Sequence, residues 1–459
     1  MLYVNPKIKW RWENEKYVIL NTCMILNKTG GELLDTIKLY NSKEKVLNEF
    51  RKKYINIPFE TLKCDVEKYI KSLLRYNIIF ENVDNFKSSP MIDPYYLNHI
   101  RDILGNSLSA PIGIACEITN KCNISCKHCC VDAVNGDINE LTTEQWKYII
   151  DQISENRVFV ITFTGGEALL REDVFDLIKY SKEKKLGTSL LTNGSLLNVK
   201  TLEKLINSGL DSISISIDGV GEVHDEFRGT NGLYKKVISI IPQIVRSNLN
   251  FGVITVLHKN IINNLYNLLQ SLNDLGVKNV SLAYYRLSGR GSINNILRPN
   301  VDDYKKIILT AWDFENKAFH TLNIKYPNLP IFYYKDTIGE ENYYKLIKKG
   351  KIGLCGAGIV GAVITPNGDI KPCDMSGNII GGNIFDKDLK YIWENDKIFK
   401  ELRKIDIYNL YPCNKCKMNH EHKCHQGCKS MPYQFDINMN HLHITDYIRE
   451  ECFNTFNKK

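Results

Sequence analysis

Short apolar runs alternate with amphipathic helical patterns between residues 111 and 286. The six runs lie at residues 112–118, 158–164, 188–192, 212–218, 251–257 and 279–285. The helical patterns between them include residues 143–154, 172–184, 201–207 and 261–275. Strands that alternate with helices predict a parallel sheet with right-handed crossovers. Six such repeats fit an α/β fold of the partial (βα)6 barrel type, whose functional residues gather at the carboxyl ends of the strands.

A different order of elements precedes these repeats. Three runs rich in aromatic and β-branched residues predict strands, and three helical patterns follow. The strands are expected at 7–12, 17–20 and 23–26, and the helices begin near Thr29, near Ser42 and ahead of Val66. Strands followed by three helices predict a separate small domain over residues 1–82. Residues 83–110, which include Pro90 and Pro94, are expected to form a linker.

Three cysteines follow the first strand of the repeats. Cys122, Cys126 and Cys129 form a C-x3-C-x2-C run. Thiolates suit iron–sulfur clusters, and three of them can hold three corners of a [4Fe–4S] cubane, which leaves one iron open. The alternative is a zinc knuckle, which needs a fourth Cys or His at fitting geometry. His128 and Cys130 lie next to the three cysteines.

This spacing resembles the signature of radical S-adenosylmethionine (SAM) enzymes. The resemblance implies that the open iron chelates SAM and that SAM cleavage yields a 5′-deoxyadenosyl radical, which abstracts hydrogen from carbon. Thr164-Gly165-Gly166-Glu167 resembles the family's GGE motif, and the string from Ser216 to Gly229 resembles SIDG…HDxxRG of relatives with auxiliary clusters. The resemblance makes six residues candidate SAM contacts: Gly165, Gly166, Glu167, Asn193, Ser216 and Arg228. Asn193 could equally belong to an ordinary turn, and Arg228 could only pin its loop through Asp225.

Seven further cysteines lie from residue 355 onward, and their layout resembles the SPASM motif, which binds two auxiliary iron–sulfur clusters. In that family's pattern one cluster would take Cys413, Cys416, Cys424 and Cys452, and the cluster nearer the active site would take Cys355, Cys373 and Cys428. The family commonly has five residues where this chain has seven between Cys416 and Cys424. Zinc ribbons are the alternative. Asp374 matches the base candidate of sulfatase-maturing relatives, although it could be a turn cap. The expected boundaries are 111–320 for the barrel and 321–459 for a helical bridge and the SPASM domain.

The composition indicates the class of protein and the compartment in which it works. The 459 residues are 43% hydrophobic and 24% charged, as in ordinary globular proteins. The N-terminus lacks the apolar region of a secretion signal, and no apolar run is long enough to span a membrane. Fourteen cysteines without an export signal indicate a reducing compartment, so we expect a cytoplasmic enzyme that uses cysteines as cluster ligands. The net charge of +8 allows an acidic partner, but the basic residues are spread along the chain, which favours a simple solvated surface.

The N-terminal pattern, with LNKTGGELLDTI where the strands give way to the helices, resembles PqqD-like domains. The resemblance implies a winged-helix-like domain that binds a leader peptide as an added strand. A DNA-binding winged helix and a structural cap are its alternatives. The whole chain resembles radical SAM/SPASM peptide maturases, and the segment Cys355 to Gly358 most resembles the sactipeptide type, which forms Cys-to-carbon thioethers. This implies a precursor peptide with a leader and a Cys-containing core, and a low-potential electron donor such as flavodoxin or ferredoxin. Carbon–carbon cross-linking, epimerisation, residue oxidation and modification of a nucleic acid are the alternatives. Cys130 is expected to be structural, or else a hydrogen-atom donor, and the loop from Arg286 to Gly291 a substrate rim or a basic loop.

Overall fold

The computed structural model describes most of the chain. The described residues are 1–5, 8, 10–13, 16–19, 24–82, 108–133, 139–247, 249–317, 320–353, 355–374, 376–377, 379–404 and 413–415. They divide into two compact units, Met1–Leu108 and Ser109–Lys459. Most of the expected linker, residues 83–107, lies outside the described residues.

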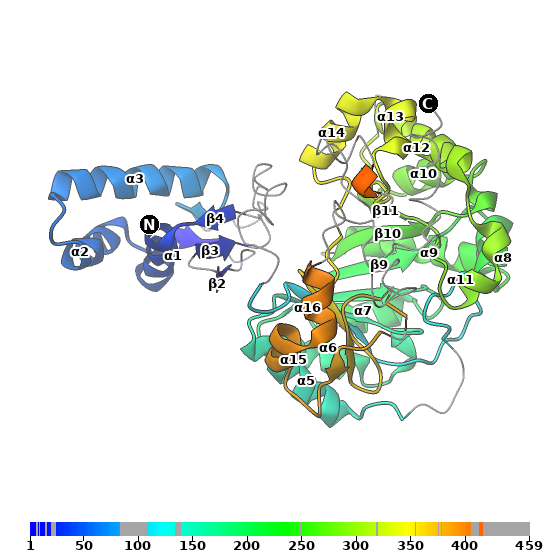
Figure 1. The fold of residues 1–459 in the computed structure, drawn as a ribbon, viewed down its shortest axis with the longest axis horizontal. Coiled ribbons are helices and arrows are strands. Elements are labelled where there is room, and N and C mark those ends of the chain that lie inside the picture. Colours follow the sequence, from blue (N-terminus) through cyan, green and yellow to red (C-terminus); the bar gives the residue numbers. More distant parts are fainter. Residues whose placement is uncertain are drawn as a thin grey trace. The chain divides into compact units, whose positions relative to one another are not determined.

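The N-terminal unit combines small antiparallel sheets with three helices (Figure 1). Strand β3 (Lys16–Ile19) pairs with β2 (Trp10–Glu13) on one side and with β4 (Met24–Leu26) on the other. A second pair joins β1 (Tyr3–Val4) to β5 (Ile79–Phe80). The helices are α1 (Lys28–Tyr40), α2 (Lys43–Lys53) and α3 (Phe59–Arg75). The predicted order of strands followed by three helices is therefore present.

Local chemistry explains where these helices begin. The side chain of Asn27 accepts a hydrogen bond from the Gly30 N–H at the start of α1, and Ser42 accepts one from the Lys45 N–H at the start of α2. On α3, Val66, Ile70 and Leu73 lie on one face and are buried in the unit's own core. This core gives the small unit a hydrophobic centre separate from that of the barrel.

The second unit contains a ten-stranded sheet with the order β12-β11-β10-β9-β8-β7-β6-β13-β14-β15. Its middle is a run of six parallel strands that match the six predicted apolar runs. These are β6 (Gly113–Glu117), β7 (Val160–Thr164), β8 (Gly187–Thr192), β9 (Ser212–Ser216), β10 (Asn250–Val256) and β11 (Asn279–Ala283). The predicted α/β fold with a partial (βα)6 barrel is confirmed.

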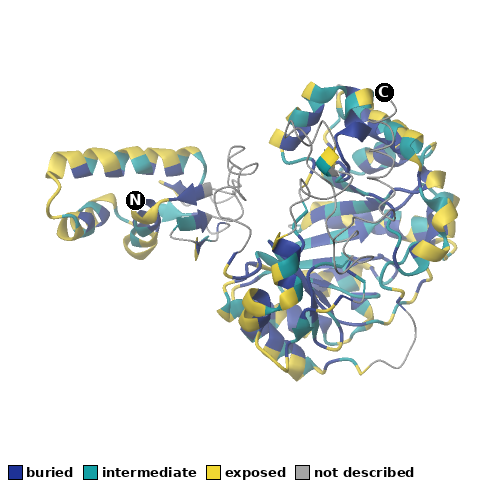
Figure 2. Cartoon of the chain, in the orientation of Figure 1, coloured by how far each residue is buried: buried dark blue, intermediate teal, exposed yellow. Residues whose placement is uncertain are grey.

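Helices follow the strands and bury their apolar faces against the sheet (Figure 2). The helices of this unit include α5 (Thr143–Glu155), α6 (Val174–Glu183), α7 (Val199–Asn207), α8 (Glu222–Arg228), α9 (Leu233–Arg246), α10 (Leu265–Asp274), α11 (Arg290–Ile293), α12 (Val301–Glu315), α13 (Phe332–Ile338), α14 (Glu340–Lys348), α15 (Leu389–Asn395) and α16 (Lys397–Lys404). Most aromatic residues of α12 to α14, among them Tyr304, Phe314 and Tyr343, are buried and form core, whereas Trp312 and Tyr344 are half-buried.

The sheet extends beyond the six predicted strands on both sides. Strand β12 (Asn323–Lys325) pairs in parallel with β11, and β13 (Gly361–Ile364) pairs in parallel with β6. β13 then turns back antiparallel into β14 (Asp369–Lys371), which pairs with β15 (Gly382–Asn383). The hairpin of β13 and β14 is therefore attached to the first barrel strand. Among the described residues, no helix has the length and apolar character needed to cross a membrane.

Candidate active site

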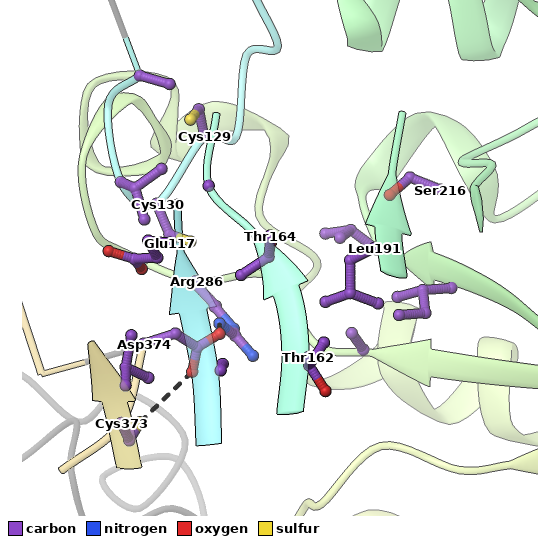
Figure 3. A pocket seen from close by; sticks show the side chains of 18 of the residues that line it. Glu117, Cys129, Cys130, Thr162, Thr164, Leu191, Ser216, Arg286, Cys373 and Asp374 are labelled. Atoms are coloured by element: carbon purple, nitrogen blue, oxygen red, sulfur yellow. Dashed lines mark hydrogen bonds and ion pairs between the residues drawn. The ribbon is translucent and has the colours of Figure 1, made fainter. Parts of the chain in front are cut away.

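A cavity of about 760 Å³ lies inside the barrel, between the strand ends and the β13–β14 hairpin (Figure 3). It brings together candidate residues from segments far apart in the sequence. The predicted residues that line it are Cys122, Cys126, Cys129, Gly165, Gly166, Asn193, Ser216, Arg228, Cys355, Cys373 and Asp374. Cys413 begins a short 3-10 helix (Cys413–Lys415), but its side chain and Cys416, Cys424, Cys428 and Cys452 lie outside the described residues.

The loop that carries the three cysteines, residues 119–133, is called the cluster loop here. The GGE segment after β7 packs directly on it: the Gly166 N–H donates to Thr119 O (2.8 Å) and the Glu167 N–H to Lys121 O (2.8 Å). A Cβ atom on Gly165, whose φ is +141°, would lie 2.3 Å from Thr119 O, and one on Gly166 would lie 2.2 Å from Lys121 O. Only glycine fits at both positions, because the two loops meet through their backbones.

Glu167 is buried and is not one of the residues that line the cavity. Its carboxylate accepts hydrogen bonds from Thr192 Oγ1 (2.8 Å), the Asn193 N–H (2.8 Å) and the Leu169 N–H (3.1 Å). Burial raises the pKa of this carboxyl group, and the three hydrogen bonds oppose that rise. Glu167 holds the backbone of Asn193 in place, and the side-chain Nδ2 of Asn193 lies 3.9 Å from Cys122 Sγ. The Glu167 carboxylate therefore acts on Cys122 of the cluster loop through Asn193.

Arg228 lies behind the second cysteine of the cluster loop. Its Nη1 is 3.6 Å from Cys126 Sγ, and its Nε donates to the buried Asp218. Burial alone would raise the pKa of Asp218, but the Arg228 guanidinium holds it below its ordinary value. The alternative partner, Asp225, instead accepts hydrogen bonds from the N–H groups of Gly232 and Tyr234, so the idea that Arg228 pins its loop through Asp225 is wrong. Sequence reasoning missed Asp218, although its position two residues after β9 marks it as a strand-end residue.

The donor set on this wall fits an iron–sulfur cluster. Cys122, Cys126 and Cys129 form no disulfide, and an amide and a guanidinium lie close to the sulfurs of two of them. Burial raises the pKa of Cys122 and Cys126, and Arg228 opposes that rise at Cys126. Within the described part of the chain, no three Cys, His, Asp or Glu side chains converge as a single metal ion requires. A cubane differs, because each thiolate binds its own iron.

The opposite wall carries two ion pairs between the barrel and the β13–β14 hairpin. Arg286, after β11, pairs with Asp374, and Lys371 Nζ lies 3.4 Å from Glu117 Oε2 at the end of β6. Burial would raise the pKa of Asp374, but Arg286 holds it below its ordinary value. Cys373 Sγ lies 3.5 Å from Asp374 Oδ1 (Figure 3). Sequence reasoning missed Glu117 and Lys371, although Glu117 sits at a strand end directly before the cluster loop.

Cys130 also lines the cavity, next to Arg286 and Glu117 (Figure 3). Burial raises the pKa of its thiol to about 11, and the nearby Arg286 opposes that rise. Cys116, on β6, is fully buried, as expected of a core residue.

Two family models match the chain where these walls lie. Residues 116–272 match the radical SAM superfamily, and residues 355–417 match an iron–sulfur cluster-binding domain, SPASM. The chain is a radical SAM enzyme. It uses SAM, a [4Fe–4S] radical cluster and auxiliary iron–sulfur clusters in its SPASM domain. The zinc alternatives are set aside.

The proteins similar to this chain carry names of different activities. An AdoMet-dependent heme synthase of Methanosarcina barkeri is 28% identical over 357 residues, which cover 75% of this chain and 96% of that protein. The mycofactocin maturase MftC of Mycobacterium tuberculosis is 26% identical, over 71% of this chain and 80% of that protein. Streptococcus suis SuiB, solved with its precursor peptide SuiA, is similar with a TM-score of 0.68 and 19% identity, over 96% of this chain and 98% of that one. That similarity shows the same fold, including a small N-terminal domain.

Proposed function

We propose that this enzyme modifies a ribosomally made precursor peptide and forms Cys-to-carbon thioether links in it. The small domain ahead of the barrel is the observation that carries this proposal, because the fold shared with SuiB extends over 96% of the chain. The solved SuiB complex contains a precursor peptide, and MftC is named a maturase, which supports a peptide substrate here. We further propose a cytoplasmic location and a low-potential electron donor such as flavodoxin or ferredoxin.

The N-terminal unit, residues 1–82, would hold the leader. Its three-stranded sheet has β3 in the centre, so β2 and β4 are its outer strands among the described residues. Peptides add to such strands through backbone hydrogen bonds, which give affinity, while pockets for alternate side chains give selectivity. The proposed division of labour is therefore leader recognition by this unit and chemistry in the barrel.

Within the barrel, Cys122, Cys126 and Cys129 would hold the radical cluster. Asn193 and Arg228 lie next to two of these sulfurs and would fix them in place. The backbone of Gly165 and Gly166 and the hydroxyl of Ser216 line the same cavity and would bind SAM. Glu167 would act by orienting Asn193. When bound, the cluster and SAM supply a 5′-deoxyadenosyl radical, which removes hydrogen from a substrate carbon.

On the opposite wall, Cys355 and Cys373, with Cys428, would hold the auxiliary cluster nearest the substrate. Asp374 is also a candidate base. Its ion pair with Arg286, however, lowers the pKa of the Asp374 carboxyl group and makes Asp374 a weaker proton acceptor. We therefore propose that Asp374 mainly anchors Arg286 beside the cavity. Acceptance of a substrate proton by Asp374 is the alternative.

Mass spectrometry of the product, combined with thiol alkylation, tests the reaction. Each thioether removes two hydrogen atoms and one alkylatable cysteine from the precursor. Loss of two hydrogens with every thiol still reactive would instead show carbon–carbon coupling or oxidation.

Epimerisation is a second candidate, because the thiol of Cys130 faces the cavity from the wall that carries Arg286. A thiol there could return a hydrogen atom to a carbon radical, and the product would have an inverted stereocentre and an unchanged mass. Replacing Cys130 with Ala would abolish the inversion but would leave thioether formation in place. This variant therefore separates the two reactions.

Heme formation is another candidate, since a relative that aligns with 75% of this chain is named a heme synthase. A porphyrin titration followed by absorbance distinguishes this candidate from the peptide reaction. Saturable binding of a porphyrin, with no change in any Cys-containing precursor, would favour it.

A further inference from the structure

The segment after β11, residues 288–294, lies against the cluster loop and is called the clamp segment here. Its central residue, Arg290, contacts the loop at four points. The backbone N–H donates to Cys129 O (3.0 Å), Nε donates to Cys126 O (2.9 Å), and Nη1 donates to Ala133 O (3.1 Å) and to Asp132 Oδ1 (2.8 Å). These hydrogen bonds of Arg290 therefore all go to the loop on which the cluster cysteines lie.

Neighbours of Arg290 complete this contact. Ser288 Oγ donates to Cys130 O (3.1 Å), and Asn294 Nδ2 donates to Lys127 O (2.9 Å). Gly289 has a φ of +51°, and a Cβ atom there would lie 2.4 Å from Cys129 O. The backbone of the clamp segment therefore approaches the loop so closely that a larger residue at position 289 would force the two apart.

We propose that the clamp segment preorganises the cluster loop, and that Arg290 is a positioning residue for the radical cluster. Between Cys126 and Ala133 the loop has no regular secondary structure, and inside it the Cys129 N–H donates to Cys126 O over a long 3.4 Å, so most of its carbonyl groups depend on donors from elsewhere. The clamp segment satisfies those of Cys126, Lys127, Cys129, Cys130 and Ala133, and the cluster itself can satisfy none of them because it binds sulfur. The loop is therefore held in shape before the cluster is inserted.

Arginine suits this task because its planar fork donates in several fixed directions at once, which lysine cannot do. Arg290 also lines the cavity, but the hydrogen bonds of its Nε and Nη1 are directed to the loop. The inference concerns the radical cluster alone and holds for any substrate, so it stands or falls separately from the peptide proposal.

The test compares full-length wild-type enzyme with Arg290→Met, both carrying all their clusters under anaerobic conditions. Iron release to a chelator is followed by electron paramagnetic resonance, which separates the radical cluster by its response to SAM. We expect the radical cluster of Arg290→Met to be lost about tenfold faster or more, given that hydrogen bonds from a charged donor are lost. The auxiliary clusters in the same molecules should be lost at the wild-type rate.

Arg171→Met is the matched control. Arg171 also donates to two backbone carbonyls, those of Ile118 (3.0 Å) and Leu141 (2.9 Å), and pairs with an aspartate, Asp173, but none of these partners belongs to residues 119–133. Hydrogen exchange in the iron-free proteins gives a second readout: amides of residues 119–133 should exchange faster in Arg290→Met and not in Arg171→Met. Arg290→Lys should lie between wild type and Arg290→Met.

Wild-type rates of cluster loss in Arg290→Met would overturn the proposal, and so would parallel loss of all clusters, which would indicate general destabilisation. If Arg290→Met does not fold, Ser288→Ala removes one donor to the loop and should raise the loss rate of the radical cluster alone. An unchanged rate in Ser288→Ala would then contradict the inference.

Discussion

At the scale of single residues, the candidate site depends on buried charges that are already paired within the protein. Arg228 pairs with Asp218 next to Cys126, and Lys371 pairs with Glu117 on the opposite wall of the cavity. Removing one partner of a buried pair strands the other charge in a poorly solvated place, which costs more than the pair itself contributes. These pairs should therefore behave as units when mutated.

Arg228→Met should destabilise the enzyme by about 3–5 kcal/mol, because it leaves Asp218 buried without its counter-charge. Adding Asp218→Asn to this variant should recover part of that loss. The free energy of unfolding from chemical denaturation of the iron-free protein measures both effects. The surface variant Arg246→Met is the control and should change stability by less than about 0.5 kcal/mol. A similarly small change in Arg228→Met would contradict the importance of the pair.

A double-mutant cycle at Arg286 and Asp374 separates the two roles proposed for Asp374. If Asp374 anchors Arg286, then Asp374→Asn and Arg286→Met should each slow product formation by about tenfold, and the double variant should be no slower than either one. A catalytic base behaves differently: Asp374→Asn would then abolish the product while Arg286→Met retained most of it. The measured rate is that of precursor modification, with 5′-deoxyadenosine formation recorded alongside.

The sequence predicted well which residues line the cavity, but it predicted poorly which side chains form hydrogen bonds and ion pairs with one another. Strand-end positions are set by the fold class, so Cys122, Asn193 and Ser216 could be placed on one wall in advance. The partner of Arg228 depends on side-chain geometry over a few ångströms. Spacing alone could not show that Asp218, rather than Asp225, lies within reach of its guanidinium.

At the scale of elements, the β13–β14 hairpin links the two walls. Its parallel register with β6 runs from Gly361 opposite Gly113 to Ile364 opposite Cys116, and this pairing places Cys373 beside the cavity. The sequence did not reveal these strands, because four- and three-residue runs carry little β-signal. The Pro-Asn-Gly turn between them, ending at Gly368 with a φ of +90°, was the available clue.

Gly368→Val should disrupt this hairpin, because valine strongly resists a positive φ and its Cβ would lie 2.8 Å from the Phe385 ring. We expect loss of the auxiliary cluster that Cys373 is proposed to bind and retention of the radical cluster, as measured by iron content and electron paramagnetic resonance. Gly353→Ala is the control, since a Cβ there meets no neighbour within 4 Å. Full retention of the auxiliary clusters in Gly368→Val would argue against the hairpin's role.

At the scale of the whole molecule, the chain consists of a small N-terminal unit and a large unit that contains the barrel, each with its own core. The sequence predicted the order of elements in both, because strand and helix periods differ clearly over long stretches. It could not predict how the sheet continues past the barrel, since the pairing of β13 with β6 joins segments about 250 residues apart.

Residues 1–85 should fold alone and bind the leader of the cognate precursor, because this unit has its own hydrophobic core. Isothermal titration with the leader peptide measures the binding. Deleting these residues should slow modification of the full precursor but spare SAM cleavage in the barrel. If the folded fragment binds duplex DNA with a steep salt dependence and ignores the leader, the recognition proposal is wrong.

Deuterium transfer from the precursor peptide to 5′-deoxyadenosine tests the central claim most directly. The precursor is deuterated at the carbons of its core and treated with the reduced enzyme and SAM. The masses of the peptide product and of 5′-deoxyadenosine are then measured by mass spectrometry. The account predicts deuterated 5′-deoxyadenosine together with loss of one alkylatable cysteine per link. It also predicts no 5′-deoxyadenosine from the variant with Cys122, Cys126 and Cys129 replaced by Ala. Formation of 5′-deoxyadenosine without deuterium, beside an unaltered precursor, would contradict a peptide substrate.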